Sequence, residues 1–462
     1  MLSAALQAEE RAAANLRDIP VLYETDVVVA GGSCAAVAAA CEAAQMGAHV
    51  VLIAPRPYLG DDLCGQQRLC LMDGEVPESE LAKALFPDGR ITTPFTVKRA
   101  LDRALLKRGI RYLTGCYATD LLVDTQGHPS GVVMINRSGS QAIKAKVVID
   151  GTRHALLARQ AGAKFRAFVA GDKELHFTVV GGDMQPAAGL TSHKLDVTYQ
   201  NPTGNKSAAA YPVYGYIAKM PLCDSSYAAF ARAEQTVRDR VCGAGMKACS
   251  ETATCYPTDT MIGEQRLEGS WPGAARCETG AFRPQGIRSL YVLSEYADVG
   301  AEGQPAMLRP LSFLAVGKSV GLAAANEAKS EPRAAEVRLA NATDAAAERI
   351  AVGDSHNVTA PFAKAGAVKV GMLDLPVLGD YDVVVVGGGT AGAPAGIAAA
   401  RSGARTLVIE YLAELGGVGT AGLIGSYWYG MRGGFTREVD EAIGAWITGT
   451  WSGRRSGCAA NY

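Results

Sequence analysis

Two stretches of the chain share one pattern of apolar runs and small residues. Residues 26–54 read DVVVAGGSCAAVAAACEAAQMGAHVVLIA, and residues 382–410 read DVVVVGGGTAGAPAGIAAARSGARTLVIE. In each, an apolar run ends in glycines, an alanine-rich stretch follows, and a second apolar run closes the pattern. Uninterrupted apolar runs are typical of parallel strands buried on both faces, and small residues let a helix lie close to a sheet. The pattern predicts strand, tight turn, helix and parallel strand, the βαβ unit of a doubly wound α/β fold.

The two stretches align without a gap at a constant offset of 356 residues, and 13 of 29 positions are identical. The register continues to Leu59-Gly60 and Leu415-Gly416. We therefore expect one whole unit and the beginning of another. The second begins with only about eighty residues left, too few for a complete domain of this kind. Three explanations stay open: a fragment of a longer tandem protein, which we favour, a second chain that completes the site, or a short unit that packs onto the first.

The later stretch carries a complete dinucleotide fingerprint. Gly387 suits a tight turn, Gly389 lets the backbone approach a diphosphate, and Gly392 lets the helix pack on the strand. The diphosphate would lie at the helix N-terminus, beside Thr390 and Ala391, where free amides and the helix dipole favour negative charge. Glu410 closes the second strand, where an acid accepts hydrogen bonds from ribose hydroxyls.

The earlier stretch keeps the scaffold but changes the chemistry. Ser33 stands where the second glycine belongs, Ala36 replaces the third, and Ala54 replaces the ribose acid. Arg56 could bind a 2′-phosphate, although a solvated surface charge is the more frequent role of such an arginine. We expect either weakened or altered dinucleotide binding, or a scaffold that has lost its cofactor. If it binds one, the contacts come from the turn residues Gly31, Gly32, Ser33, Cys34 and Ala35.

Composition excludes several classes of protein. The chain has 462 residues, 48% of them hydrophobic and 20% charged, which is typical of a globular protein of two or three domains. A net charge of −1 gives no electrostatic case for nucleic acid or an anionic membrane, and no apolar run is long enough to span a bilayer. Glu9 and Glu10 argue against a signal peptide, so residues 1–22 are predicted to be an exposed helix. The eleven cysteines lack metal-site spacing and predict reduced, mostly buried thiols in a cytoplasmic protein.

Further motifs extend the pattern on both sides of the first unit. The loop LGGVGTAGL, with Gly416, Gly417 and Thr420, follows the later stretch, whereas LGDDLCGQQ in the earlier one brings Asp61 and Asp62 toward cofactor phosphates. Downstream lie an amphipathic helix and a β-meander ending in VVIDGT (residues 147–152), then SLYVLSEYADVG (residues 289–300) and the helix LRPLSFLAVGKSVGLAAANEA. With these motifs the sequence resembles the FAD-dependent oxidoreductases of the two-dinucleotide-binding flavoprotein group.

The resemblance implies FAD as cofactor and a Rossmann-like doubly wound sheet with an inserted mixed α+β domain. In that group an acid after the late strand holds the ribityl chain, so Glu295 is the expected equivalent and Asp298 a second candidate. The helix that follows would point its N-terminus at the flavin pyrimidine. The implied organisation is a first FAD/NAD(P)-binding-like domain (23–172 and 272–330), a substrate-side domain (173–271), a connecting, partly helical segment (331–374) and a partial second FAD/NAD(P)-binding domain (375–462).

The substrate-side domain offers few candidates for chemistry. Asp259, Glu264 and Arg266 could orient a substrate or act as a base, but a solvated charged loop is the more frequent explanation. His176 and Tyr256 are weak candidates, and the catalytic acid or base stays unidentified. No metal ligands are expected.

The leading hypothesis is a flavin-dependent oxidoreductase in which FAD accepts hydride at N5 from a small organic substrate. Two alternatives stay open: a catalytically silent first unit that supports an active second unit, and a nicotinamide-dependent enzyme without flavin. The expected partners are a small-molecule substrate and whatever completes the second unit, with neither nucleic acid nor membrane.

Overall fold

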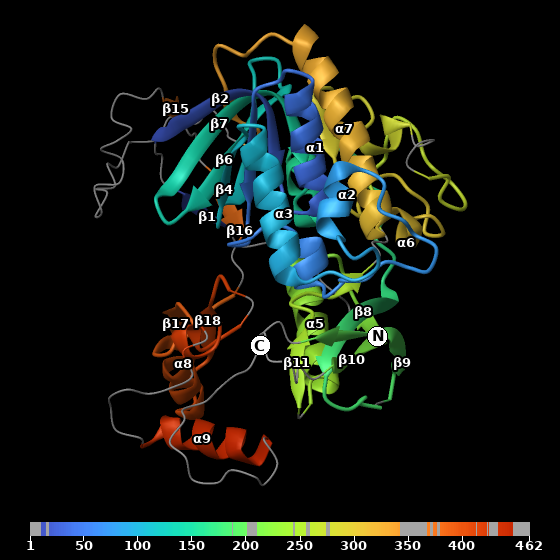
Figure 1. Cartoon of the computed structure of the whole chain (residues 1–462). Coiled ribbons are helices and arrows are strands. Elements are labelled where there is room, and N and C mark those ends of the chain that lie inside the picture. The colour runs from blue at the N-terminus through green and yellow to red at the C-terminus, as the bar shows by residue number, and fades with distance from the viewer. Residues whose placement is uncertain are drawn as a thin grey trace.

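The computed structural model describes most of the first three quarters of the chain and parts of the remainder (Figure 1). The described residues are 11–14, 18–186, 188–200, 210–243, 245–255, 259–273, 278–341, 367–369, 373–376, 379–412, 414–422, 424 and 433–446.

A nine-stranded mixed sheet forms the centre of the molecule, with strand order β14-β5-β6-β7-β2-β3-β4, β13 also pairing with β7, and β15 with β2. The pairs β2–β3, β3–β4, β2–β7 and β7–β13 are parallel, whereas β5, β6 and β7 form the predicted antiparallel meander. The strands are β2 (Asp18–Ala30), β3 (Val50–Ala54), β4 (Arg111–Thr114), β5 (Tyr117–Val123), β6 (Pro129–Asn136), β7 (Gly139–Asp150), β13 (Leu290–Val292), β14 (Arg338–Leu339) and β15 (Ala367–Lys369). The doubly wound α/β prediction is confirmed.

Alternate residues of the central strands enter two cores. Val27 and Val29 of β2 pack against the helices, while Val28 and Ala30 enter a second core with the meander, as the period of two along a strand requires. The first core joins the sheet to the long helices (Figure 1). The helices of this unit are α1 (Cys34–Gln45), α2 (Glu80–Leu85), α3 (Pro94–Lys107), α4 (Leu156–Gln160), α6 (Gln304–Met307) and α7 (Pro310–Ser330).

Small residues let α1 and α7 lie unusually close together. A Cβ on Gly317 would overlap the Ala35 carbonyl oxygen, and a Cβ on Gly321 would overlap that of Ala39. The alanine-rich composition of α1 thus serves contact with α7 as well as with the sheet. This contact fixes the helix that follows the glycine turn.

An antiparallel sheet and one helix form the inserted part, whose strand order is β11-β8-β10-β9 with β12 beside β8. Its apolar core lies between β8, β10 and α5. The elements are β8 (Gly171–Gly181), β9 (Leu190–Gln200), β10 (Ala210–Leu222), α5 (Tyr227–Val241), β11 (Met246–Cys249) and β12 (Thr254–Cys255). The Ser226 hydroxyl caps α5 by accepting a hydrogen bond from the Ala229 amide (3.2 Å).

The second stretch folds as a separate two-stranded parallel unit, with β17 (Val383–Val386), α8 (Gly392–Arg401) and β18 (Thr406–Ile409). Its register repeats that of the first: Val383 pairs with Thr406, as Val27 pairs with Val50, 356 residues earlier. Below, the first segment means residues 26–65 and the second segment residues 382–422. Helix α9 (Phe435–Trp446) follows and joins α8 through Arg401 and Glu438 (2.8 Å).

One expectation about the connecting parts needs correction, and the partly helical connection expected at 331–374 falls mostly on residues 342–366, outside the described residues. Residues 11–14 are the strand β1 and residues 18–22 begin β2, so the described part of 1–22 is not helical; residues 1–10 lie outside the described residues. In the predicted 331–374 connection, the described elements are the strands β14, β15 and the start of β16 (Leu373–Pro376), which pairs with β1. Strand pairing outweighed the local preference for helix at residues 11–14 and 18–22.

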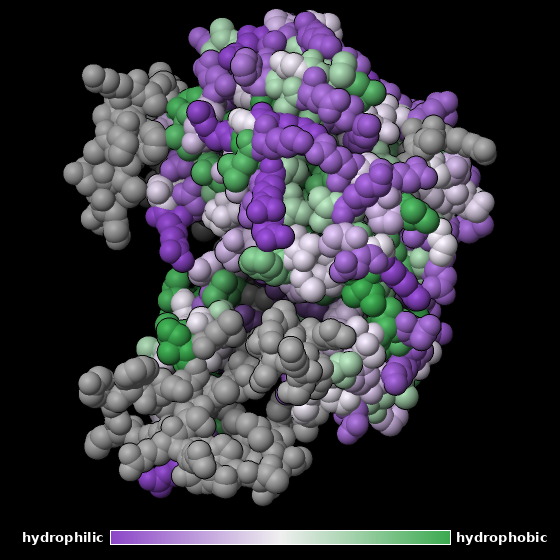
Figure 2. Space-filling model, viewed as in Figure 1, coloured by the Kyte–Doolittle hydropathy of each residue, from purple (hydrophilic) through white to green (hydrophobic). Residues whose placement is uncertain are grey.

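The surface gives no sign of a membrane-spanning element in the described residues. None of the described helices combines the length and the apolar composition that crossing a bilayer requires. Figure 2 shows hydrophilic side chains over much of the face that carries α2 and α3, with apolar side chains in scattered patches.

Candidate dinucleotide sites

The glycine turn of the second segment joins β17 to α8. Gly387 has a φ of +99°, a left-handed value that favours glycine, and its amide donates to the Ile409 carbonyl (2.8 Å). A Cβ on Gly392 would overlap the Gly387 carbonyl oxygen, whereas a Cβ on Gly389 would meet open space among the described residues. The turn therefore needs its first and third glycines for its own packing, and the second leaves room for a ligand.

Glu410 lies at the mouth of this turn. Its Oε2 accepts a hydrogen bond from the Gly388 amide (2.7 Å), and its Oε1 accepts from the amides of Tyr411 (2.8 Å) and Leu412 (2.9 Å). The carboxylate is thus held beside the glycines, where a ribose attached to a bound diphosphate would lie. That Glu410 binds a ribose stays a prediction.

The loop after β18 runs along the same turn. Gly416 donates to the Gly388 carbonyl (2.9 Å) and accepts from the Thr390 hydroxyl (3.0 Å). Gly417 approaches Gly389 so closely that a Cβ there would lie 3.0 Å from the Gly389 Cα, and the Thr420 hydroxyl donates to the Leu415 carbonyl (2.6 Å). The predicted residues of the second segment are therefore neighbours in space. Helix α8 begins at Gly392, and the methyl group of the preceding cap residue, Ala391, offers no side-chain acceptor to the first helical amides.

The first segment reproduces the backbone of this arrangement. Gly31 donates to the Ile53 carbonyl (2.8 Å) and Gly60 to the Gly32 carbonyl (2.7 Å), the same bonds 356 residues earlier. A Cβ on Gly31 would lie 2.8 Å from the Gly151 carbonyl oxygen, which ties the turn to the end of β7. The Ser33 hydroxyl caps α1 by accepting from the Ala36 amide (3.1 Å). Ser33 therefore caps α1, whereas the equivalent residue of the second segment, Gly389, leaves open space.

A carboxylate of the protein lies against the N-terminus of α1. Asp62 accepts hydrogen bonds from the Cys34 amide through Oδ1 (2.9 Å) and from the Cys34 thiol through Oδ2 (2.8 Å). Burial and the neighbouring Asp62 raise the pKa of Cys34 well above its usual range, so the thiol stays protonated and donates. Val418 holds the equivalent position in the second segment. The sequence indicated negative charge near this turn but not a bond to the helix.

Asp61 and Asp62 begin a π-helical turn (Asp61–Gly65), and both carboxylates are shielded from solvent. Burial, then the charge on Asp62, raises the pKa of Asp61; burial also raises that of Asp62, against the hydrogen bonds from Cys34. The first crevice is the space beside the glycine turn of the first segment. Two carboxylates there disfavour the binding of another anion.

Arg56 is neither a solvated charge nor free for a 2′-phosphate. Its guanidinium forms an ion pair with Glu251 (3.2 Å), and its side chain is 20% exposed. Glu251 also accepts a hydrogen bond from the Tyr58 hydroxyl (2.6 Å). The arginine thus connects the first segment to the inserted domain, which corrects both earlier interpretations of this residue.

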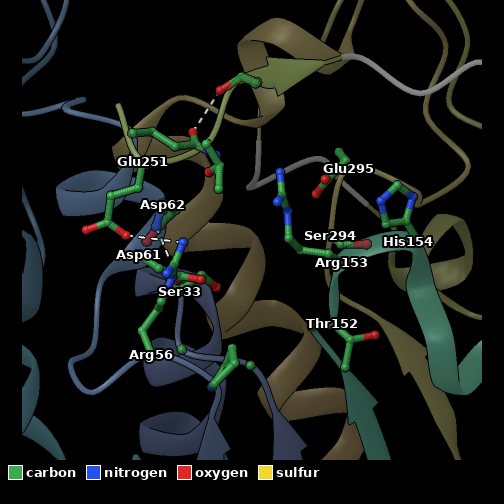
Figure 3. Close-up of a pocket in the computed structure, with 18 of the residues that line it drawn as sticks. Ser33, Arg56, Asp61, Asp62, Thr152, Arg153, His154, Glu251, Ser294 and Glu295 are labelled. Carbon is green, nitrogen blue, oxygen red and sulfur yellow. Dashed lines mark hydrogen bonds and ion pairs between the residues drawn. The ribbon is translucent and has the colours of Figure 1, made fainter. Parts of the chain in front are cut away.

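A cavity of about 1050 Å³ opens beside the first turn. It extends between the central sheet, the inserted domain around α5, and Glu410 to Leu412 of the second segment, whose Tyr411 carbonyl accepts from the Tyr117 hydroxyl (3.1 Å). Figure 3 shows charged side chains of the first segment facing those that follow β7 and β13. The labelled residues are Ser33, Arg56, Asp61, Asp62 and Glu251 on one side and Thr152, Arg153, His154, Ser294 and Glu295 on the other.

The late strand lies where the resemblance implied. β13 extends the parallel sheet beside the end of β7, so Glu295 lines the cavity, and burial raises its pKa. Asp298 has a different role from the one considered for it. Its buried carboxylate pairs with Arg166 (2.9 Å) and Arg266 (2.9 Å) and accepts from the Gly263 amide (2.9 Å), away from the residues that line the cavity.

His154 was missed by the sequence reasoning. It lines the cavity with a left-handed φ of +63°, packs against Phe230, and lies 2.6 Å from the Tyr296 hydroxyl through Nδ1. Burial, then Arg153 and Arg159, lowers the pKa of His154 to about 4, and burial raises that of Tyr296. Both groups are therefore neutral near pH 7, and they share one hydrogen bond between the Tyr296 hydroxyl and Nδ1 of His154. In the structure, the left-handed backbone of His154 distinguishes it from its neighbours. No sequence motif indicates its position in the cavity.

The substrate-side candidates form ion pairs in place of a reactive cluster. Asp259 is buried and pairs with Arg159 (2.9 Å), Glu264 pairs with Arg283 (3.5 Å), and Arg266 pairs with Asp298. The expected solvated loop is therefore partly buried and structural. His176 is not among the residues that line the cavity, and Tyr256 lies outside the described residues.

A model of the FAD dependent oxidoreductase family matches residues 26–214 and 382–456, more than half of the chain. The chain belongs to this family. Its cofactor is FAD. No curated protein matches the sequence significantly.

Several solved structures show weaker likeness. CabE, an aromatic hydroxylase from angucycline biosynthesis, is 14% identical with a TM-score of 0.39, over 65% of this chain and 63% of CabE. The flavin-dependent brominase Bmp2 is 12% identical (TM-score 0.39; 68% of this chain, 81% of Bmp2). A geranylgeranyl bacteriochlorophyll reductase-like protein from Thermoplasma acidophilum is 13% identical (TM-score 0.39; 67% and 79%). The chain thus spans less than two thirds of the length of CabE.

The two turns differ in how well their residues fit FAD. In the second segment, the open Gly389, the uncapped start of α8 and the carboxylate of Glu410 suit a diphosphate and its ribose. In the first segment, Asp62 binds the start of α1, Ser33 replaces the open glycine, and Ala54 has no acceptor for a ribose hydroxyl. FAD fits the second turn and does not fit the first.

Proposed function

We propose that this member of the FAD-dependent oxidoreductase family oxidises a small organic substrate by hydride transfer to flavin N5, with the FAD diphosphate held at the second turn. Bound FAD supplies the redox chemistry, while the protein supplies binding, orientation and electrostatics. Under this proposal the first unit supports the second and binds no flavin itself.

The observation that carries the proposal is the contrast between two helix N-termini of the same backbone design. At α8 no side chain caps the helix, and an acid lies at the neighbouring strand end. At α1 the Cys34 amide already donates to Asp62. Because a diphosphate binds through unsatisfied amides and the helix dipole, the α8 terminus is the better site.

The proposed setting is the cytoplasm, with a small-molecule substrate and no nucleic-acid or membrane partner. The nine cysteines within the described residues are free thiols, which supports a reducing compartment. A net charge of −1 supports the absence of a polyanionic partner.

Two measurements test the redox proposal. The purified protein should show visible flavin absorbance, and mass spectrometry of the molecule released on denaturation should identify FAD. Anaerobic mixing with a panel of small alcohols and amines should then bleach the flavin for at least one compound, more slowly when its reacting carbon carries deuterium. Protein that takes up no FAD, or bleaching that proceeds without an isotope effect under conditions where reduction limits the rate, would count against hydride transfer.

A further inference from the structure

In the first segment, a side chain of the protein lies where a dinucleotide would place its diphosphate. We propose that the Asp62 carboxylate substitutes for the diphosphate at the start of α1, so that the first crevice binds no dinucleotide. This proposal concerns the first crevice alone and does not depend on hydride transfer.

Two side chains already satisfy the amides at the start of α1. The Cys34 amide donates to Asp62 (2.9 Å) and the Ala36 amide donates to Ser33 (3.1 Å). These are the groups through which a helix N-terminus binds phosphate. A carboxylate at this position also interacts favourably with the helix dipole, as a phosphate would. Asp62 and Ser33 together therefore accept from two of the amides that would bind a phosphate, and the Asp62 carboxylate provides the negative charge that the helix dipole favours.

The loop that carries Asp62 is fixed on its far side. Gly60 has a φ of +83°, and a Cβ there would lie 2.7 Å from Val97 and 2.9 Å from Leu101, both on α3. Leu63 and Cys64, in the π-helical turn, are buried in the core shared with α1 and α3. Because Leu63 and Cys64 are part of the core, this segment cannot move away as an exposed loop could. Asp62 is therefore held against the start of α1.

The negative charge of the first crevice also disfavours a bound diphosphate. A diphosphate brings at least two negative charges, and here it would meet Asp61 as well as Asp62. Like charges at close range in a poorly solvated site disfavour one another. In the second segment the equivalent residues are Gly417 and Val418, which carry no charge. At this position of the shared backbone, the first segment therefore repels an anion, whereas the second segment carries no charge that would repel one.

ADP is a suitable probe, because it carries the diphosphate and ribose of FAD without the flavin. The test uses the full chain with Gly389→Val, which fills the open position of the second turn. This variant should bind no ADP by titration calorimetry. Adding Asp61→Gly and Asp62→Val, which installs the residues of the second segment, should create ADP binding, with an affinity gain of at least about tenfold over the Gly389→Val protein.

Each result decides the matter. Clear ADP binding to the Gly389→Val protein would overturn the proposal, and so would a folded triple variant that still binds none. Asp62→Asn in place of Asp62→Val serves as the matched control: it keeps an oxygen for the Cys34 amide, so the crevice should stay closed.

Hydrogen exchange of the natural protein covers the case in which the triple variant does not fold. Saturating FAD should leave the exchange of amides 34–37 unchanged, and slowed exchange there would contradict the proposal. The same data separate the closed first crevice from the FAD site at the second turn. FAD that protects amides 388–393 but not 34–37 supports both, whereas protection at neither turn contradicts the second-turn site and leaves the closed first crevice supported.

Discussion

The Glu410 carboxylate accepts a hydrogen bond from the Gly388 amide at 2.7 Å, and in the first segment the equivalent side chain is the methyl group of Ala54. This pair holds an acid against the glycine turn before any ligand is bound. The second segment thus has a ready acceptor for ribose hydroxyls, which the first segment lacks.

Replacing Glu410 should lower the affinity for FAD and have a smaller effect on the stability of the folded protein. A hydrogen bond to a charged group contributes about 1.5–3 kcal/mol, so Glu410→Ala should raise the FAD dissociation constant about tenfold to a hundredfold. Flavin fluorescence quenching on titration measures this. The control is Glu438→Gln, which removes an acid at the exposed contact between α8 and α9; an equal loss of affinity in that variant would contradict a specific role for Glu410.

The contact between α1 and α7 should tolerate no added methyl group. A Cβ on Gly317 would overlap the backbone carbonyl of Ala35, which cannot move without shifting α1. Alanine ordinarily stabilises a helix by up to about 1 kcal/mol over glycine, but overpacking against backbone costs about 1–3 kcal/mol. We expect Gly317→Ala to lower the free energy of unfolding in urea by about 1–2 kcal/mol.

Leu322→Ala on the exposed side of the same helix is the control for this measurement. Leu322 is 39% exposed, so its truncation should change stability by about 0.5 kcal/mol or less. A Gly317→Ala protein as stable as the natural one would mean that the two helices are farther apart than described.

His154 should make the protein less stable as the pH falls. Its pKa is lowered to about 4 in the folded protein, against about 6.5 in the unfolded chain. Between these values the unfolded chain binds more protons, so stability is complete above about pH 6.5 and is lost progressively toward pH 4, by at most about 3 kcal/mol.

Replacing His154 by Asn removes this titration, and Asn tolerates the left-handed backbone of residue 154. Urea unfolding at several pH values should give a flatter stability profile between pH 6.5 and 4 for His154→Asn than for the natural protein. The difference between the two profiles isolates His154 from carboxylates such as Asp61, whose raised pKa acts in the opposite sense. Parallel profiles would show that His154 is not buried and neutral.

Local patterns predicted much of this molecule. The apolar runs and glycines of residues 26–54 and 382–410 predicted the same βαβ backbone, and the structure gives both the same register. The amphipathic run at residues 94–107 and the meander before Asp150 also formed as expected. These features depend on neighbouring residues in the sequence, which is why they could be read from it.

Features that depend on distant contacts could not be predicted. The strand at residues 18–22 exists because β7 and β15 pair beside it. Asp298 looked like a cofactor ligand by position, yet Arg166, 132 residues away, holds it in the interior. The bond from Cys34 to Asp62 depends on the path of a loop across the start of α1, and the sequence alone gave only the sign of the charge.

The most direct test of the second-turn site is the amount of FAD bound per chain in four purified proteins. These are the natural chain, Gly389→Val, Ser33→Val and, as a control at an open glycine outside the turns, Gly433→Val. We predict that FAD is retained by the natural protein, Ser33→Val and Gly433→Val, and lost from Gly389→Val. Loss of FAD from Ser33→Val with full retention by Gly389→Val would contradict the account.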